Sequence, residues 1–272
     1  MKQKKPSDTP RAIIRILTMA ALTLCTLPSW AWDEGVPLAL AKLRANQLGN
    51  LRYQLDVTLP NERTAPVCGT VEISFERKGK DDVTLDFEGR NVDKTCTVNG
   101  VDTDTEWTQG HIRIAAALLR EGANSVRIGF TADDKALNRH DDYLYTLFVP
   151  ALAHTVFPCF DQPDLKARFT VNLRMPEGWT SLHSDASHPI PTYLFSFTAG
   201  RFSEATALRN GRKLRMLYRE TDPKKTAQAH DIMDEAAQAI AWMERYTGID
   251  FPWGEYGFVV LPGYQFGGME HP

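Results

Sequence analysis

The chain has 272 residues, of which 43% are hydrophobic and 24% charged, an ordinary composition for a globular protein of one or two domains. The first 31 residues hold five bases and one acid, so the rest of the chain carries 26 bases and 33 acids, a net charge of −7. Because binding to nucleic acid needs a concentrated basic face, this acidic body argues against a nucleic-acid partner.

The N-terminal 31 residues have the features of a secretory signal peptide. A basic stretch precedes an uncharged apolar run from Ile16 to Leu27, and the small residues Ser29 and Ala31 occupy the −3 and −1 positions of a cleavage after Ala31. This run is shorter than the roughly 20 residues that a helix needs to span a bilayer. We therefore predict export, to a bacterial periplasm or the extracellular space, with no stable membrane anchor once residues 1–31 are removed. An uncleaved anchor is the alternative.

Cleavage would remove Cys25 and leave Cys68, Cys96 and Cys159, three cysteines that cannot all pair. Cys68 and Cys96 both lie in strand-like stretches, so they could form a disulfide in an oxidising compartment. Free thiols are equally compatible with the sequence. The spacing of the cysteines carries no metal-binding signature.

From residue 51 to about residue 202 the dominant pattern is alternation of apolar and polar residues, which is typical of half-buried strands. Short runs of this kind begin at Leu51, Val71, Val83, Ile112, Val126 and Phe169. Asn99-Gly100 has the composition of a hairpin turn. Many short strands separated by turns predict an antiparallel, sandwich-like or saddle-shaped β domain.

The pattern then becomes helical. Asp222 and Pro223 predict the start of a helix of about 25 residues, and Gly248 predicts its end. Its apolar positions at helical spacing are Ile232, Ala236, Ile240, Met243 and Tyr246. A short strand of the buried type follows at residues 258–261. We place a β domain at residues 32–205 and the incomplete start of an α+β domain at residues 206–272, since about 60 residues are few for an independent core.

Three stretches suggest a function when they are taken in order. Residues 156–170 contain Pro-Cys-Phe-Asp-Gln-Pro, in which Asp161 suits a rigid turn capped by its own side chain. Residues 191–202 form an aromatic-rich strand-like run. Residues 263–271 read Gly-Tyr-Gln-Phe-Gly-Gly-Met-Glu-His. Gly267 and Gly268 lack side chains, so a peptide could approach their backbone, and Glu270 could accept hydrogen bonds from an α-ammonium group. Alone, this third stretch would read as an exposed loop.

Together, the three stretches resemble the aminopeptidase N family of zinc metallopeptidases. The resemblance implies a β domain followed by the start of a thermolysin-like catalytic domain, and an enzyme that removes N-terminal residues from peptides with a free amine. It assigns Gly267, Gly268, Met269 and Glu270 to substrate binding, as the counterpart of the family's G-x-M-E-N motif. It assigns the residues around Asp161 a structural role in the wall that faces the active site.

The sequence departs from the family pattern at two positions. His271 stands where the family has Asn after this Glu. Many family members also place a second amine-binding acid or amide about 12 residues before the aspartate of the first stretch, and here that position is Val149, which cannot accept an ammonium group. Asp141 and Asp142 are candidates to compensate, although adjacent acids usually form a solvated turn.

The family binds catalytic zinc through H-E-x-x-H and a later Glu, and none of the seven histidines of this chain begins such a motif. His230 precedes Asp234 by one helical turn, but we interpret this pair as a solvated helix face. We therefore expect no catalytic residue and no metal ligand within these 272 residues, with zinc implied only for a complete enzyme. The alternative function is a catalytically inactive module that binds peptides or a partner protein.

Overall fold

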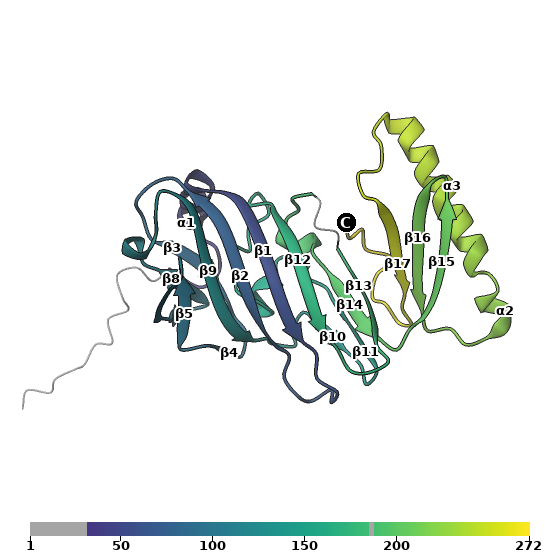
Figure 1. The fold of residues 1–272 in the computed structure, drawn as a ribbon, viewed down its shortest axis with the longest axis horizontal. Coiled ribbons are helices and arrows are strands. Elements are labelled where there is room, and N and C mark those ends of the chain that lie inside the picture. The colour runs from purple at the N-terminus through teal and green to yellow at the C-terminus, as the bar shows by residue number, and fades with distance from the viewer. Residues whose placement is uncertain (1–31, 185–187) are drawn as a thin grey trace, which may run out of the picture.

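The structure is a computed structural model that describes residues 32–184 and 188–272. The predicted signal peptide at residues 1–31 therefore lies outside the described residues. Two parts are visible in Figure 1: a large β domain, and a smaller α+β unit that carries the C-terminus. Among the described residues, no helix is both long enough and apolar enough to cross a membrane.

A seven-stranded sheet forms the larger layer of the β domain, with strand order β12-β1-β2-β9-β5-β6 and β4 beside β9. Its strands are β1 (Leu48–Thr58), β2 (Cys68–Arg77), β4 (Asn91–Val92), β5 (Thr95–Val98), β6 (Val101–Asp104), β9 (Gly122–Thr131) and β12 (Ala167–Arg174). The predicted alternation is present, since Leu51, Tyr53, Leu55 and Val57 of β1 are buried while the residues between them are not. One pair differs from the antiparallel expectation, because β1 and β12 run parallel.

Two smaller sheets complete the β domain. One has the order β3-β8-β7 and the other the order β10-β11-β14-β13. Their strands are β3 (Val83–Asp86), β7 (Glu106–Thr108), β8 (His111–Ile114), β10 (Leu137–Arg139), β11 (Tyr143–Thr146), β13 (Thr180–His183) and β14 (Phe197–Gly200). Helix α1 (Leu38–Gln47) precedes the sheets, and three short 3-10 turns join strands: η1 (Ala116–Leu118), η2 (Ala153–Thr155) and η3 (Thr192–Leu194).

The core of the β domain is continuous and rich in aromatic rings. Phe169 stacks on Tyr53 at 4.8 Å and on Phe195 at 4.6 Å between ring centroids, and Tyr53 accepts a hydrogen bond from the backbone N–H of Phe160. The predicted hairpin turn is confirmed, with positive φ at both Asn99 and Gly100 between β5 and β6. The predicted class, a mainly antiparallel β domain followed by an α+β segment, is confirmed.

All three cysteines of the described chain are free thiols. Cys96 and Cys159 are buried, whereas Cys68 is exposed and its sulfur lies 3.6 Å from the hydroxyl of Thr131. Of the two alternatives left open by the sequence, the structure therefore has the free form.

The C-terminal unit is a three-stranded sheet with one helical layer on it (Figure 1). It comprises β15 (Ser203–Arg209), β16 (Arg212–Tyr218), α2 (Pro223–Thr226), α3 (Ala229–Thr247) and β17 (Glu255–Val260). β15 and β16 form an antiparallel hairpin, and β17 returns parallel to β16 after the helical crossover. The boundary that we placed between residues 205 and 206 lies within β15.

The predicted helix of about 25 residues is two helices. Asp222 caps α2 by accepting from the backbone N–H of Lys224 at 2.9 Å, as expected. A turn of the 3-10 type follows α2, since the N–H of Gln228 donates to the carbonyl of Lys225, three residues before it. Helix α3 begins after this turn. Gly248 ends α3 with φ of 68°, as predicted.

The face of α3 that packs on the sheet is not the one that the sequence suggested. Ala229, Met233 and Ala237 are its buried residues. The predicted stripe lies beside this face, and its members Ile232, Met243 and Tyr246 are 38%, 49% and 75% exposed. The strand predicted at residues 258–261 is not buried either: Phe258 and Val259 are half-buried and Val260 is exposed, since α3 packs mainly on β15 and β16.

Candidate peptide-binding site

The segment with the predicted site residues leaves the end of β17 and runs back onto the β domain (Figure 1). The chain turns at Gly263, whose φ of +68° is in the left-handed region that glycine adopts without strain. The ring of Tyr264 then packs edge-on against Tyr145 of β11, with centroids 5.5 Å apart. At the far end, Nδ1 of His271 lies 3.0 Å from the carbonyl oxygen of Leu194 in η3. The segment is thus held against the β domain at both of its ends.

Between these two contacts the predicted binding residues lie open to solvent. Gly267, Gly268 and Glu270 are exposed, and Met269 is half-buried. A Cβ added to either glycine would meet no atom within 4 Å, apart from its chain neighbours. The packing of the described chain therefore does not require glycine at these positions, and the space beside the backbone is free for a ligand.

Aromatic side chains beside this segment were not recognised in the sequence as part of a site. Tyr264 contacts both Tyr145 and Phe266, the latter at 6.1 Å between centroids. Burial raises the pKa of the Tyr264 phenol, and the negative charge of Glu270 raises it further. Burial also raises the pKa of Tyr145. Tyr145 is one of two tyrosines in a mainly apolar strand, so only the long-range contact with Tyr264 distinguishes it.

The Pro-Cys-Phe-Asp-Gln-Pro turn lies at the centre of a buried polar network. Cys159 exchanges backbone hydrogen bonds with Asp86, and the carboxylate of Asp86 accepts from the N–H of Asp161 at 2.9 Å. The carboxylate of Asp161 accepts from the hydroxyl of Thr192 at 2.6 Å and from both the backbone N–H and Nδ1 of His154. The hydrogen bonds of the Asp161 side chain thus go to a backbone N–H in η2 and to side chains in η2 and η3, rather than to its own turn as predicted.

This network connects the turn to the candidate site. Thr192, which is held by Asp161, opens η3, and Leu194 at the end of η3 carries the carbonyl that binds His271. The turn thus supports the loop on which the segment with Glu270 rests. This is the structural role that the sequence suggested for Asp161, although the partners in it are up to 77 residues apart and leave no local pattern.

A buried ion pair anchors α1 to the same network. The guanidinium of Arg44 donates to both carboxylate oxygens of Asp86, at 2.9 and 2.6 Å, and both side chains are almost fully buried. Burial alone would raise the pKa of Asp86, but Arg44 and His111 outweigh it and hold the pKa below its usual value. His111 lies between Asp86 and the backbone carbonyl of Asp33; burial opposes its charge, yet these two acceptors raise its pKa.

The acids proposed to compensate for Val149 have other surroundings. Asp142 forms an ion pair with Arg219 at 2.6 Å, where the β domain meets the C-terminal unit. Asp141 is 91% exposed and lies 3.7 Å from Arg63, as expected for a solvated turn. Val149 itself is half-buried. Asp142 is therefore a junction residue.

The same junction is fixed by a second arginine and by close packing. Arg215 of β16 donates to the carbonyl of Ser181 in β13 at 2.9 Å, and also pairs with Glu204. A Cβ at Gly257 of β17 would lie 2.8 Å from a terminal methyl group of Leu182, so a larger residue there would displace this side chain. These contacts orient the C-terminal unit on the β domain, and with it the candidate segment.

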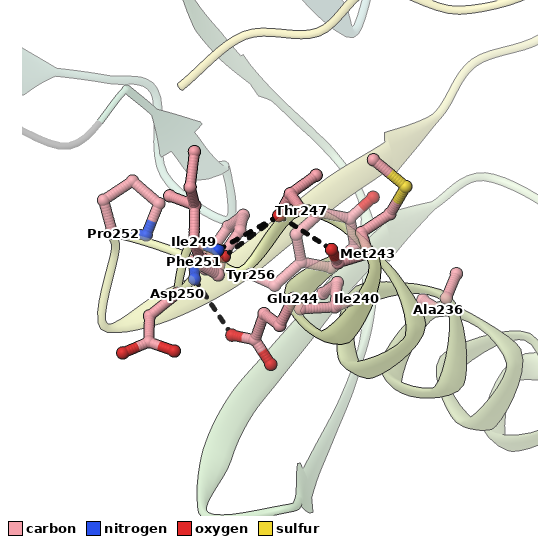
Figure 2. A pocket seen from close by; sticks show the side chains of 11 residues that line it. Ala236, Ile240, Met243, Glu244, Thr247, Ile249, Asp250, Phe251, Pro252 and Tyr256 are labelled. Carbon is pink, nitrogen blue, oxygen red and sulfur yellow. Dashed lines mark hydrogen bonds between the residues drawn. The ribbon is translucent and has the colours of Figure 1, made fainter.

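A groove of about 460 Å³ lies elsewhere, at the C-terminal end of α3. Figure 2 shows Ile240, Met243, Ile249, Phe251 and Tyr256 around it, with Glu244 hydrogen-bonded to the N–H of Phe251. None of its lining residues belongs to residues 263–271. The groove is mainly apolar and is separate from the predicted site.

The described residues do not form a zinc site. No group of three or more His, Cys, Asp or Glu side chains within residues 32–184 and 188–272 is arranged to hold a metal ion. His154 is bound to Asp161, His271 to a backbone carbonyl, and His230 is on the exposed side of α3. The described residues therefore do not fit the zinc implied by the resemblance.

The match to a known family covers more than half of the chain. Residues 50–188 match the Peptidase M1 N-terminal domain, and the chain belongs to this family. The match includes the turn around Asp161 and ends before the segment with Glu270.

Individual relatives agree with this assignment. The chain is 25% identical to aminopeptidase N of Streptomyces lividans over 259 residues, covering 85% of this chain and 30% of that protein. It is 29% identical to human endoplasmic reticulum aminopeptidase 1 over 144 residues, covering 46% of this chain and 15% of that protein. The chain thus spans less than a third of the length of these relatives.

A solved structure shows the same fold. An M1 zinc metallopeptidase from Deinococcus radiodurans, bound to a Tyr-Ser-Ala substrate, superimposes with a TM-score of 0.64 at 20% identity, covering 81% of this chain and 58% of that one. At this identity the likeness is one of fold.

Proposed function

We propose that this chain is the N-terminal part of an exported zinc-dependent aminopeptidase, in which Glu270 binds the α-ammonium group of a peptide. Gly267 and Gly268 present open backbone to the first residues of that peptide, and Met269 lies beside them. Membership of the M1 family supports an aminopeptidase-type function. The Deinococcus radiodurans relative is bound to a short peptide, the class of ligand that we propose here.

The observation that carries the proposal is the placement of the Glu270 segment. Its two ends are fixed on the β domain by Tyr264 and His271, while the carboxylate between them is exposed. A charged group on a fixed backbone gives an oriented acceptor, and an ammonium group forms charge-assisted hydrogen bonds with it. A peptide with a blocked N-terminus lacks this interaction, which would select free amines.

Binding without catalysis is the second candidate. It draws on the same observation, an exposed acid on a segment that is fixed to the β domain at both ends. In this version the same segment captures free N-termini, and the chain by itself hydrolyses nothing. Both candidates share the amine site.

The amine site is tested by comparing a tripeptide amide that has a free N-terminus with its N-acetylated form. We expect the 272-residue chain to bind the free amine about tenfold more tightly, and Glu270→Gln to abolish this preference, because a hydrogen bond between two charged groups contributes about 1.5–3 kcal/mol. Glu235→Gln, at an exposed acid on α3, is the matched control and should retain it. Equal binding of the two peptides by the unmodified chain would refute amine recognition.

Catalysis is tested on the same protein. We expect no hydrolysis of an aminoacyl-anilide and no stoichiometric binding of zinc by the 272-residue chain. Activity that a chelator removes would refute the assignment of the catalytic residues to a region outside this chain.

Export is proposed from the sequence pattern of residues 1–31 alone. Expression in a bacterium followed by fractionation should yield a periplasmic or secreted protein that begins after Ala31. A cytoplasmic product that keeps its N-terminus would contradict this part of the proposal.

A further inference from the structure

His271 replaces an asparagine of the family pattern, and its ring has a fixed orientation in this chain. Nδ1 lies 3.0 Å from the carbonyl oxygen of Leu194. A carbonyl oxygen can only accept, so Nδ1 must carry the proton in this hydrogen bond. Burial lowers the pKa of His271, against the opposing effects of the Leu194 carbonyl and Glu270, so the ring is neutral at neutral pH. In the neutral ring with a proton on Nδ1, Nε2 is an acceptor.

The acceptor nitrogen of His271 is available to a ligand. No described residue forms a hydrogen bond with Nε2, and this nitrogen is not among the buried polar atoms that lack a partner. It is therefore in contact with solvent. The hydrogen bond at Nδ1 fixes the orientation of the half-buried ring, and Nε2 is therefore an acceptor that faces solvent in a fixed direction.

The backbone brings this acceptor close to Glu270. The N–H of His271 bonds to the carbonyl of Met269 at 3.1 Å, which closes a three-residue turn centred on Glu270. Glu270 and His271 are therefore neighbours in a tight turn and not in an extended strand, where successive side chains point to opposite faces. The charge of Glu270 also opposes the lowering effect of burial on the pKa of the His271 ring.

A peptide's α-ammonium group has three N–H donors, and one carboxylate rarely satisfies all three. We propose that Nε2 of His271 accepts one hydrogen bond from this ammonium group while Glu270 accepts the others. This inference rests on the proposed amine site at Glu270. It gives His271 two tasks: it fastens the segment to Leu194 and it adds a second, uncharged acceptor. Asp142 is bound to Arg219, and the side chain of Val149 has no acceptor.

The tautomer is tested first, by nitrogen NMR of the 272-residue chain labelled at histidine. We expect the His271 ring to be neutral at pH 7.5, with its proton on Nδ1. A ring that is protonated at both nitrogens, or that carries its single proton on Nε2, would overturn the proposal, because neither form can accept from an ammonium group.

The acceptor role is tested with the same peptide pair, a tripeptide amide with a free or an acetylated N-terminus. His271→Phe should reduce the preference for the free amine about tenfold. His271→Asn, whose amide has both a donor and an acceptor, should restore part of it. A residue that only supports the segment would instead weaken both peptides equally, and this result would overturn the proposal. The spectrum of the β domain reports that each variant is folded.

The Glu270→Gln variant separates the two levels of inference. If Glu270→Gln removes the amine preference while His271→Phe leaves it intact, the role of His271 is wrong and the proposed function stands. If neither variant changes the preference, both are wrong. In the unmodified chain, the preference should also fall as the pH decreases through the pKa of His271, since protonation removes the acceptor, while the acetylated peptide binds as before.

Discussion

The β domain and the C-terminal unit bury their apolar residues to very different extents. Within the described residues, the apolar cluster of the β domain contains 40 buried side chains, whereas that of the C-terminal unit contains five. The unit also leaves Trp242, Tyr246 and Ile249 exposed on and just after α3. The β domain can therefore bury charged groups such as Arg44 and Asp86, while the unit lacks the core to cover its own helix. The candidate site lies where the two parts meet, and its geometry depends on the β domain, because Tyr264 and His271 hold the segment against that domain.

The largest expected effect is at the buried ion pair of the β domain. Arg44→Met should lower the free energy of unfolding by about 3–5 kcal/mol, because it leaves the Asp86 carboxylate buried without its main partner. The exposed pair between Arg63 and Asp141 is the matched control, and Arg63→Met should cost less than about 1 kcal/mol. Urea unfolding measures both. Equal, small losses would show that Asp86 is not held in a closed core.

Core truncation should separate the two regions next. Met233 is the fully buried side chain of α3, and Met233→Ala should cost about 2–5 kcal/mol within the C-terminal unit. Hydrogen exchange measures where that loss occurs: amides of residues 210–272 should exchange faster, and those of residues 50–202 should be unchanged.

The variant to compare with Met233→Ala is in the core of the β domain. Phe195→Ala, at a ring that stacks on Phe169, should cost about 3–5 kcal/mol and accelerate exchange throughout residues 50–202. In the unmodified chain, residues 210–272 should already be the less protected. Uniform protection along the chain would contradict the difference between the two regions.

A smaller effect is expected from pH, and it belongs to the β domain. Burial opposes the charge of His111 and His154, but carboxylate neighbours raise the pKa of both. The stabilisation from a histidine with a raised pKa is complete below its unfolded value of about 6.5, and is lost as the pH rises through the folded value. The urea concentration at the unfolding midpoint should therefore decrease as the pH rises above about 6.5.

The variant His154→Gln tests whether His154 contributes to this pH dependence of stability. It keeps a polar side chain beside Asp161 and removes the titration, so the decrease of the midpoint above neutral pH should become smaller. An unchanged slope would mean that folding does not raise the pKa of His154.

The sequence was sufficient for strands such as β1, which are covered on one face and exposed on the other. Alternation such as Leu51, Tyr53 and Leu55 follows directly from that environment. The same reasoning failed on α3, where two apolar stripes lie side by side and only tertiary packing decides that Met233 rather than Ile232 faces the sheet.

The candidate site was predictable only in part. Glu270 and its glycines stood out as a contiguous motif. The contacts that hold the motif, from Tyr264 to Tyr145 and from His271 to Leu194, join residues more than 70 positions apart. Neither contact has a local pattern, since each depends on how the C-terminal unit docks on the β domain.

The smallest expected effect concerns the exposed side of α3. Tyr246 is 75% exposed and its ring stacks on Trp242 at 4.9 Å, so Tyr246→Ser removes one contact between two solvated rings. Thermal unfolding should change by less than about 0.5 kcal/mol, as for other surface substitutions. A loss of 2 kcal/mol or more, or one that grows with protein concentration, would mean that this face is covered in solution. The C-terminal unit would then have a larger core than its own residues provide. Its difference from the β domain would then reflect the absence of a second chain on α3 and not a shortage of apolar residues.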